Sequence, residues 1–153
     1  MPELLAKDIM TENVITIKHD ASIKELSELL LEKKISGVPV IDEEGKLIGI
    51  ASEGDVIVQD TELHSPRYFK ILDAIIYLES LNKFKERLMK HLAVKVSEIM
   101  TKKVITASAQ TRVDEIAEIM VNEKINRVPV VSEDGRPIGI ITRADILKSI
   151  VKN

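Results

Sequence analysis

The pattern of apolar and polar positions predicts two amphipathic helices of the same kind, one near each end of the chain. The stretches "SIKELSELLLEKK" and "TRVDEIAEIMVNEK" place apolar residues three and four positions apart, with polar residues between them. Ser22 stands just before the first helix and Glu25 three residues later, a spacing typical of a helix N-cap. The apolar positions are Ile23, Leu26, Leu29 and Leu30, then Val113, Ile116, Ile119 and Met120.

Short apolar runs on either side of each helix predict strands. "VITI" and "VITA" come before the helices; "GVPVI" and "LIGIA", or "RVPVV" and "PIGII", come after them. "DEEGK" and "SEDGR" then predict hairpin turns, with Gly45 and Gly135 at the position that needs a positive φ. A further helix is expected to open at Ser52 or Thr142. Each unit is therefore predicted to be β-α-β-β-α.

The two units are copies of one sequence. Residues 8–57 align with residues 98–147 without a gap, and about 19 of about 50 paired positions are identical. Two copies are too few for a solenoid, so we expect two halves that pack with pseudo-twofold symmetry in an α/β (α+β) fold. The predicted boundaries are 1–60 for the first repeat, 61–95 for an insertion and 96–153 for the second repeat.

The insertion matches neither copy and holds all four aromatic residues of the chain. "YFKILDAIIYLESL" has a broad apolar face at helical spacing, and "NKFKERLMKHL" continues it, so a helical insertion of one or two segments is expected. It could be an extra packing layer, a dimer contact, or a lid that lends an aromatic ring to a ligand. The sequence does not separate these alternatives.

Composition narrows the class of protein. The 153 residues are 44% hydrophobic and 31% charged, as in an ordinary globular protein. There is no cysteine, which excludes disulfides and thiolate metal sites. The net charge of −3 argues against a nucleic-acid binder. Charged residues soon after Met1 predict no signal peptide, and no apolar run approaches the roughly 20 residues of a membrane span, so a cytoplasmic location is expected.

Several catalytic patterns are missing from the sequence. His19, His64 and His91 are scattered, with no second ligand at metal spacing. There is neither a phosphate-binding loop of the Gly-x-x-x-x-Gly-Lys type nor a Gly-x-Ser-x-Gly elbow. The paired carboxylates at 43–44 and 133–134 fall in predicted turns, where solvation explains them. We therefore expect neither an enzyme nor a metal site.

The duplicated motifs resemble those of a tandem pair of cystathionine-β-synthase-type (CBS) domains, known as a Bateman module. The matching motifs are "DIMT" and "EIMT", "SGVPVIDEEGKLIGI" and "NRVPVVSEDGRPIGI", and "SEGD" and "TRAD". The resemblance implies a disc-like module with two symmetry-related clefts for AMP, ADP, ATP or S-adenosyl compounds. It also implies a regulatory role and a homodimer.

In such modules a glycine, a hydroxyl residue and an aspartate recognise ribose. The resemblance transfers this role to Gly49, Ser52 and Asp55, and to Gly139, Thr142 and Asp145. An ionised carboxylate can accept hydrogen bonds from both ribose hydroxyls, and the adjacent helix N-terminus favours phosphate oxygens. The same spacing is also typical of a helix cap, and the two roles can coexist.

The resemblance further implies that adenine lies against strand edges of the same half. The alternative for each of these residues is an ordinary core strand. The expected residues are Ile15, Thr16, Gly37, Val38 and Pro39 in the first copy, and Ile105, Thr106, Arg127, Val128 and Pro129 in the second.

The copies differ where a phosphate needs a cation. Gly37 in the first copy corresponds to Arg127 in the second, and Glu53 to Arg143. Arg127 matches a phosphate-binding position of the family, and Arg143 could add a second contact; both can serve either cleft, or be solvated cations. Lys102 and Lys103 are further candidates. We expect unequal sites: a phosphorylated nucleoside at Asp145, and a less charged ligand or none at Asp55, where Glu53 opposes phosphate.

These features predict a regulatory sensor of an adenosine-containing small molecule that signals to an effector protein, without a catalytic cofactor. The alternative is an interaction scaffold or dimerisation module with vestigial clefts, in which the aromatic residues of the insertion dock a partner. Neither a membrane nor a nucleic acid is expected as a partner.

Overall fold

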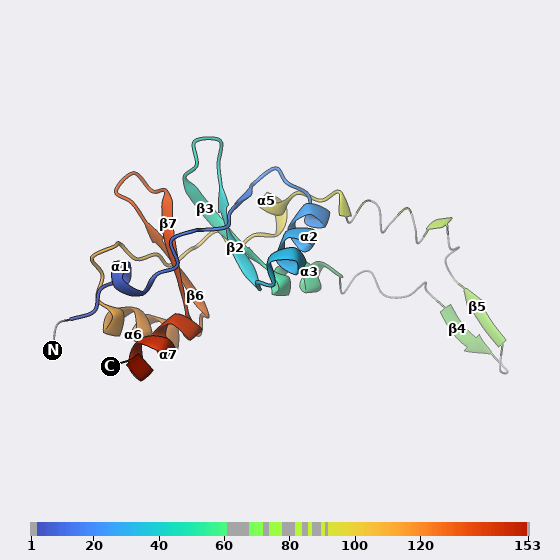
Figure 1. Ribbon diagram of the computed structural model, residues 1–153. Helices are drawn as coiled ribbons and strands as arrows, with labels where there is room; N and C mark the ends of the chain where they lie inside the picture. The colour runs from blue at the N-terminus through green and yellow to red at the C-terminus, as the bar shows by residue number, and fades with distance from the viewer. Residues whose placement is uncertain are drawn as a thin grey trace.

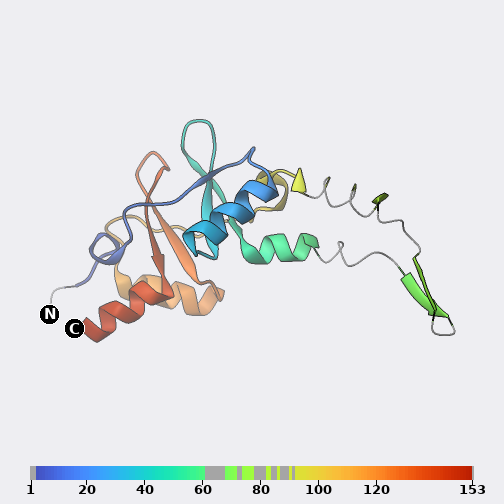
Figure 2. The same ribbon diagram turned by 45° about the vertical axis from the view of Figure 1, so that its right-hand side comes forward.

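The computed structural model shows two similar halves that lie side by side, with the β4–β5 hairpin apart from both (Figures 1 and 2). It describes residues 3–60, 68–71, 74–77, 82–83, 86, 90 and 92–152. In chain order the elements are α1 (Ala6–Ile9), β1 (Ile17–Lys18), α2 (Ile23–Lys33), β2 (Gly37–Ile41), β3 (Leu47–Ser52), α3 (Glu53–Asp60), β4 (Tyr68–Ile71), β5 (Ala74–Tyr77), α5 (Val96–Ile99), α6 (Val113–Glu123), β6 (Arg127–Val131), β7 (Pro137–Thr142) and α7 (Arg143–Lys152).

The predicted β-α-β-β-α order and the mixed α/β class are confirmed. In the first half, β2 pairs with β3 antiparallel and with β1 parallel. In the second half, β6 pairs with β7 antiparallel, and the place of β1 is taken by a single parallel bridge between Ala107 and Val130. The first strand is thus shorter than predicted over residues 14–17, because pairing begins only at Ile17.

Local signals place the turns and helix ends where the sequence predicts them. The Ser22 hydroxyl oxygen accepts a hydrogen bond from the Glu25 amide at 3.1 Å, which caps α2. Gly45 and Gly135 adopt φ values of 81° and 85° in the hairpin turns, as predicted.

The core of each half includes a short helix from the other end of the repeat: α1, before the first copy, packs in the second half, and α5, before the second copy, packs in the first. Helix α1 contributes Ala6 to the core of the second half, and α5 contributes Val96 to the core of the first. The Thr11 amide donates to the Ile140 carbonyl at 2.9 Å, and the Thr101 amide donates to the Ile50 carbonyl at 2.8 Å. Residues 9–11 and 99–101, named here the "IMT" segments, therefore cross between the halves and hold them together.

The hairpin tips also meet. The Leu47 amide donates to the Gly135 carbonyl at 2.9 Å, and Arg136 Nε donates to the Glu44 carbonyl at 3.1 Å. Both hairpins project in the same direction from the two halves, as both views show (Figures 1 and 2). This arrangement fits the expected pseudo-twofold packing.

The helix predicted at the start of the insertion is wrong where the structure describes it. Residues 68–71 and 74–77 form an antiparallel pair in which Tyr68 lies opposite Tyr77. A short apolar run rich in aromatic and β-branched residues suits a strand as well as a helix, and its periodicity cannot decide between them. Residues 82–83, 86, 90 and 92 are helical. Phe84 lies outside the described residues, as do the contacts that would decide the role of the insertion.

None of the helices in the described part of the chain combines the length and the apolar character needed to cross a membrane.

Because the "IMT" segments cross, Gly49 is predicted to tolerate no side chain. A Cβ atom there would lie 2.6 Å from Met100 Sδ and 2.9 Å from the Thr101 carbonyl oxygen. We expect Gly49→Ala to lower the free energy of unfolding by about 1–3 kcal/mol, because backbone must move to admit the methyl group. Urea denaturation measures the change. The matched control is Gly54→Ala in α3, where a Cβ meets only Ser52 Oγ at 3.5 Å. That substitution should raise stability by up to about 1 kcal/mol, and equal effects of the two substitutions would contradict the close contact.

Candidate ligand clefts between the two halves

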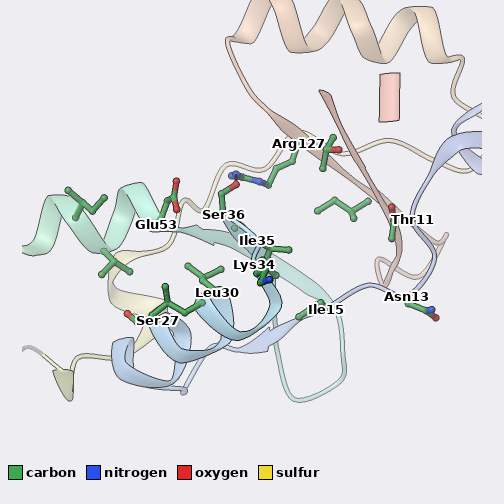
Figure 3. Close-up of a pocket in the computed structure, with 16 residues that line it drawn as sticks. Thr11, Asn13, Ile15, Ser27, Leu30, Lys34, Ile35, Ser36, Glu53 and Arg127 are labelled. Atoms are coloured by element: carbon green, nitrogen blue, oxygen red, sulfur yellow. Dashed lines mark hydrogen bonds between the residues drawn. The ribbon is translucent and has the colours of Figure 1, made fainter. Parts of the chain in front are cut away.

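Two clefts of unequal size lie between the halves. The larger, named here the Thr142 cleft, has a volume of about 810 Å³ and is shown in Figure 3. The smaller, named the Asp55 cleft, has a volume of about 240 Å³. The Thr142 cleft is lined by Thr11, Asn13, Ile15, Lys34, Ile140 and Thr142, among others. The equivalent residues Thr101, Lys103, Ile105, Lys124, Ile50 and Ser52 line the Asp55 cleft.

Each cleft combines parts of both copies. The Thr142 cleft joins the end of β7 to Ile15 and Gly37 of the first half. The Asp55 cleft joins the end of β3 to Ile105 of the second half. The expectation that the ribose motif and the adenine strands come from the same half therefore does not match the geometry. Because the "IMT" segments cross, the strand that follows each of them faces the other copy's helix start.

The two helix starts share two internal hydrogen bonds, and the first has a third, which the Asp55 amide donates to Ser52 Oγ at 3.4 Å. Asp55 Oδ2 accepts from the Ser52 amide at 2.9 Å and from the Ser52 hydroxyl at 3.1 Å. Asp145 Oδ2 accepts from the amide and the hydroxyl of Thr142 at the same two distances. Both aspartates thus lie in the first turn of α3 or α7 and cap its N-terminus, and all four residues are half-buried.

The two aspartates nevertheless differ in their place relative to the clefts. Ser52 and Asp55 both line the Asp55 cleft, so there a capping carboxylate also faces the cavity. Of the equivalent pair Thr142 and Asp145, only Thr142 is part of the lining of the Thr142 cleft. At Asp55, therefore, a capping carboxylate also lines a cleft.

Arg127 reaches from β6 across to the first half. Its Nη2 donates to Ser36 Oγ at 2.5 Å, and its side chain lies beside Ser36 in Figure 3. Burial lowers the pKa of Arg127 from its usual value, and the Coulomb attraction of Glu53 and Asp55 opposes this shift. A guanidinium stays protonated despite such a shift, so Arg127 is a half-buried positive charge at the clefts.

Gly37 makes room for this arginine. A Cβ atom at Gly37 would lie 2.7 Å from both Cζ and Nη1 of Arg127. The absence of a side chain at Gly37 therefore allows the guanidinium to lie over β2.

Four of the predicted adenine-contacting residues lie in the protein interior. Their side chains are fully buried, so they occupy the place of an ordinary core strand rather than of a cleft wall. These residues are Val38, Pro39, Val128 and Pro129.

The remaining predicted residues are divided between the clefts and the surface. Ile15, Gly37, Ile105 and Arg127 line a cleft, whereas Thr16 and Thr106 line neither. Arg143 is exposed and lines neither cleft.

The charged residues around the clefts differ from their expected arrangement. Glu53 was expected beside the Asp55 site, but it lines the Thr142 cleft. Lys103 lines the Asp55 cleft, and Lys102 lines neither. The Asp55 cleft consequently gathers Lys103, Lys124 and Arg127 around one carboxylate.

Sequence reasoning missed several lining residues that come from the crossing segments and from the ends of α2 and α6. Lys34 and Lys124 end these helices in the left-handed conformation, each with a φ of 55°. Their position at helix ends, immediately before the strands, was the available signal. Thr11 was recognised as a motif residue but not as a cleft residue, and Asn13 was not singled out, because the crossing is a tertiary feature.

Sequence reasoning also missed a polar cluster distant in sequence. His19 Nε2 lies 3.2 Å from Glu43 Oε1, and Asp20 stands next to them, all within 4.8 Å of one another. The β2–β3 turn brings Glu43 to His19, a proximity that residue spacing cannot reveal. The three residues line neither cleft, and both carboxylates are exposed.

The CBS domain family model matches this chain twice, over residues 6–60 and 96–152. The chain therefore belongs to the CBS domain family and carries a tandem pair of these domains.

Relatives of this chain include a protein of about the same length and others that are longer. The uncharacterised protein MJ1426 of Methanocaldococcus jannaschii is 33% identical, and the match covers 97% of this chain and 92% of that protein. For chloroplastic CBSX1 of Arabidopsis thaliana the identity is 31%, over 92% of this chain and 61% of that protein. Inosine-5'-monophosphate dehydrogenase of Aquifex aeolicus is 36% identical, over 91% of this chain but 23% of the enzyme.

Solved CBS-pair structures share the fold. The crystal structure of CBSX2 in complex with AMP has a TM-score of 0.74 and 27% identity, covering 97% of this chain and 96% of that one. The CBS domain pair of MJ0100, in complex with 5'-methylthioadenosine and S-adenosyl-L-methionine, has a TM-score of 0.71 and 30% identity. That match covers 99% of this chain and 98% of the other.

The capping geometry predicts a stability effect that needs no ligand. We expect Asp145→Ala to lower the free energy of unfolding by about 1 kcal/mol, because the Thr142 amide and hydroxyl lose their acceptor. Asp145→Asn keeps an acceptor oxygen and should lose less. Urea denaturation of ligand-free protein measures both. If the two variants were equally stable and unchanged from wild type, the carboxylate would not act as a cap.

Proposed function

We propose that the chain is a regulatory module that binds an adenosine-containing ligand between its CBS domains and signals to another protein. The observation that carries this proposal is the Thr142 cleft. It lies between the halves, is walled by aliphatic side chains, and holds a hydroxyl and a guanidinium from the second copy. Its volume of about 810 Å³ lies in the range of small-molecule sites.

The lining suits the three parts of a nucleotide. Ile15, Ile35 and Ile140 offer aliphatic surface to an adenine ring. Thr142 stands at a helix start, where amide groups and the positive end of the helix dipole favour an anion or a ribose oxygen. Arg127 offers a fork of N–H donors that matches a phosphate.

Known relatives support this ligand class. CBSX2 was solved with AMP, and the MJ0100 pair with 5'-methylthioadenosine and S-adenosyl-L-methionine. The match to an enzyme covers only 23% of that enzyme, which fits a module that accompanies catalytic domains rather than one that catalyses a reaction. We therefore infer binding and regulation without a catalytic cofactor.

The two clefts are proposed to be unequal. The Thr142 cleft has room for a nucleotide, and Arg127 reaches into it, although Glu53 stands nearby and weakens the local positive charge. The Asp55 cleft is more basic but has a volume of only about 240 Å³, below the usual range of ligand sites. We expect a phosphorylated nucleoside to occupy the Thr142 cleft first.

Signalling follows from the composite walls of each cleft. A ligand in the Thr142 cleft touches β7 of one half and Ile15 of the other, so its affinity depends on how the halves are placed. A ligand shifts such an equilibrium only through this differential affinity. The scaffold alternative predicts no adenosine ligand at all, and ligand binding therefore separates the two.

Arg127→Ala tests the phosphate assignment. We expect the affinity for AMP to fall by about 10- to 100-fold, because a charge-assisted hydrogen bond is lost. The affinity for adenosine, which has no phosphate, should change little. Isothermal titration calorimetry measures both ligands.

The matched control is Arg143→Ala, which removes the same charge from an exposed residue outside both linings. It should leave AMP binding near the wild-type value. In wild type, AMP at 100 times its dissociation constant should raise the free energy of unfolding by about 2.7 kcal/mol. Absence of any shift with AMP, ADP, ATP or S-adenosylmethionine would refute the sensor.

We further infer that the chain forms a homodimer through its helix pairs. Leu31 on α2 and its equivalent Val121 on α6 are 79% and 76% exposed. Ile57 on α3 and its equivalent Leu147 on α7 are 61% and 62% exposed. In both views α6 and α7 lie together at one end, and α2 and α3 together in the other half (Figures 1 and 2). Paired apolar faces related by symmetry suit contact with a second copy.

Charge on one of these faces should break the dimer. We expect the double substitution Val121→Glu/Leu147→Glu to convert a dimer into a monomer, because two carboxylates per chain would be buried without partners. Size-exclusion chromatography with light scattering reports the mass. Lys148→Ala, an exposed change on the same helix, is the control and should leave the mass unchanged. A wild-type monomer at about 100 µM, where even weak association is detectable, or a dimer unaffected by the two glutamates would contradict this interface.

A further inference from the structure

Among the described residues, Arg127 is the one side chain shared by the linings of the two clefts. Other equivalent positions give each cleft a residue of its own, as Lys34 and Lys124 do. The position equivalent to Arg127 is Gly37, which has no side chain to offer. Two clefts therefore have one guanidinium between them.

Arg127 belongs to the lining of both clefts, and its guanidinium contacts residues of the Thr142 cleft. It lies over Gly37 and donates to the Ser36 hydroxyl at 2.5 Å, and both residues line the Thr142 cleft. The nearby carboxylates are divided: Glu53 lines the Thr142 cleft and Asp55 lines the other. Both attract the positive charge of Arg127. Each cleft therefore holds a carboxylate that attracts the charge of Arg127.

A phosphate in one cleft changes what the other cleft can offer. A guanidinium binds a phosphate best through two parallel N–H groups, and this fixes its orientation. Once it is engaged, its charge is compensated, and a second phosphate meets an anion in place of a free cation. Lysines remain near each cleft, but they are exposed and therefore more strongly screened by water. The cost falls on the second anionic ligand only.

We propose that the two clefts compete for Arg127, so that one phosphorylated adenosine ligand bound to the chain weakens the binding of a second about tenfold, whereas uncharged adenosine shows no such coupling. The proposal rests on the function proposed above and adds to it a regulatory property. By linkage, the weakening is reciprocal between the clefts. The module thus responds to the first anionic ligand and resists the second.

Closing one cleft at a time distinguishes competition for Arg127 from a simple difference in ligand affinity between two independent clefts. Ile15 and Ile105 are equivalent half-buried residues, each in the lining of one cleft. Ile15→Trp should close the Thr142 cleft and Ile105→Trp the Asp55 cleft. Urea denaturation shows whether the Ile15→Trp and Ile105→Trp variants fold. If they do not, Thr11→Trp and Thr101→Trp are used in their place, because these equivalent exposed residues also line the clefts. Calorimetry with AMP and with adenosine is then carried out on the full chain.

Competition has a clear signature in these titrations. We expect the second AMP to bind wild type about tenfold more weakly than AMP binds the weaker of the two single-cleft variants. With adenosine, the two wild-type constants should equal those of the single-cleft variants. In an Arg127→Ala background, AMP should behave as adenosine does, because the shared cation is gone.

Three results would overturn the proposal. If the weaker wild-type AMP constant equals that of the weaker single-cleft variant, the clefts are independent. If the tenfold weakening persists without Arg127, another group couples the clefts. If the variant in which the tighter-binding cleft is closed binds no AMP, the chain has only one AMP site and no coupling between sites is possible. A wild-type chain that binds neither AMP nor adenosine refutes the proposed function itself, whereas uncoupled binding of both ligands refutes only the competition.

Discussion

The exchange of the two "IMT" segments is the constraint on which the rest of the structure depends. Helix α1 fills the core of the second half and α5 fills that of the first, and each segment is fixed by hydrogen bonds to a strand of the half it enters. Gly49 and Gly139 lie against Met100 and Met10 so closely that any side chain would collide with a sulfur. Neither half can therefore form its full core alone. The halves are one folding unit, although the sequence repeats.

The same exchange creates the clefts. After residue 11 the chain returns from the second half to the first and passes the start of α7. After residue 101 it returns from the first half to the second and passes the start of α3. It thereby places Ile15 opposite Thr142, and Ile105 opposite Ser52. A cavity built in this way has walls that belong to both halves. A ligand bound there would contact both halves, so it would shift their placement only if it bound one arrangement more tightly than another.

The sequence was sufficient wherever the cause is local. The capped start of α2 at Ser22, the glycine turns and the order of elements depend on neighbouring residues, and all were predicted. The β4–β5 pairing was not, because its apolar run satisfies two periodicities and only pairing chooses between them. The site was predicted in part. The helix starts and Arg127 were identified, but the partnership of each helix start with the opposite copy depends on the crossing segments.

Buried strand residues show the same limit. Val38 and Val128 belong to a motif that carries ligand-facing residues, yet strand alternation turns their side chains into the core. The proximity of His19 to Glu43 depends on the β2–β3 turn, which lies beside the residues that follow β1. Such contacts join segments that are distant along the chain. Residue spacing alone does not contain them.

The contact between Gly37 and Arg127 also bears on how a duplicated chain loses its symmetry. The two positions face each other across the pseudo-twofold axis, and a Cβ at Gly37 would lie 2.7 Å from the arginine's guanidinium. Two identical copies with arginine at this position would direct both long side chains into the same space. A side chain at position 37 would therefore displace the guanidinium from its place over β2. At this contact the arginine of one copy occupies the space that the glycine of the other leaves open.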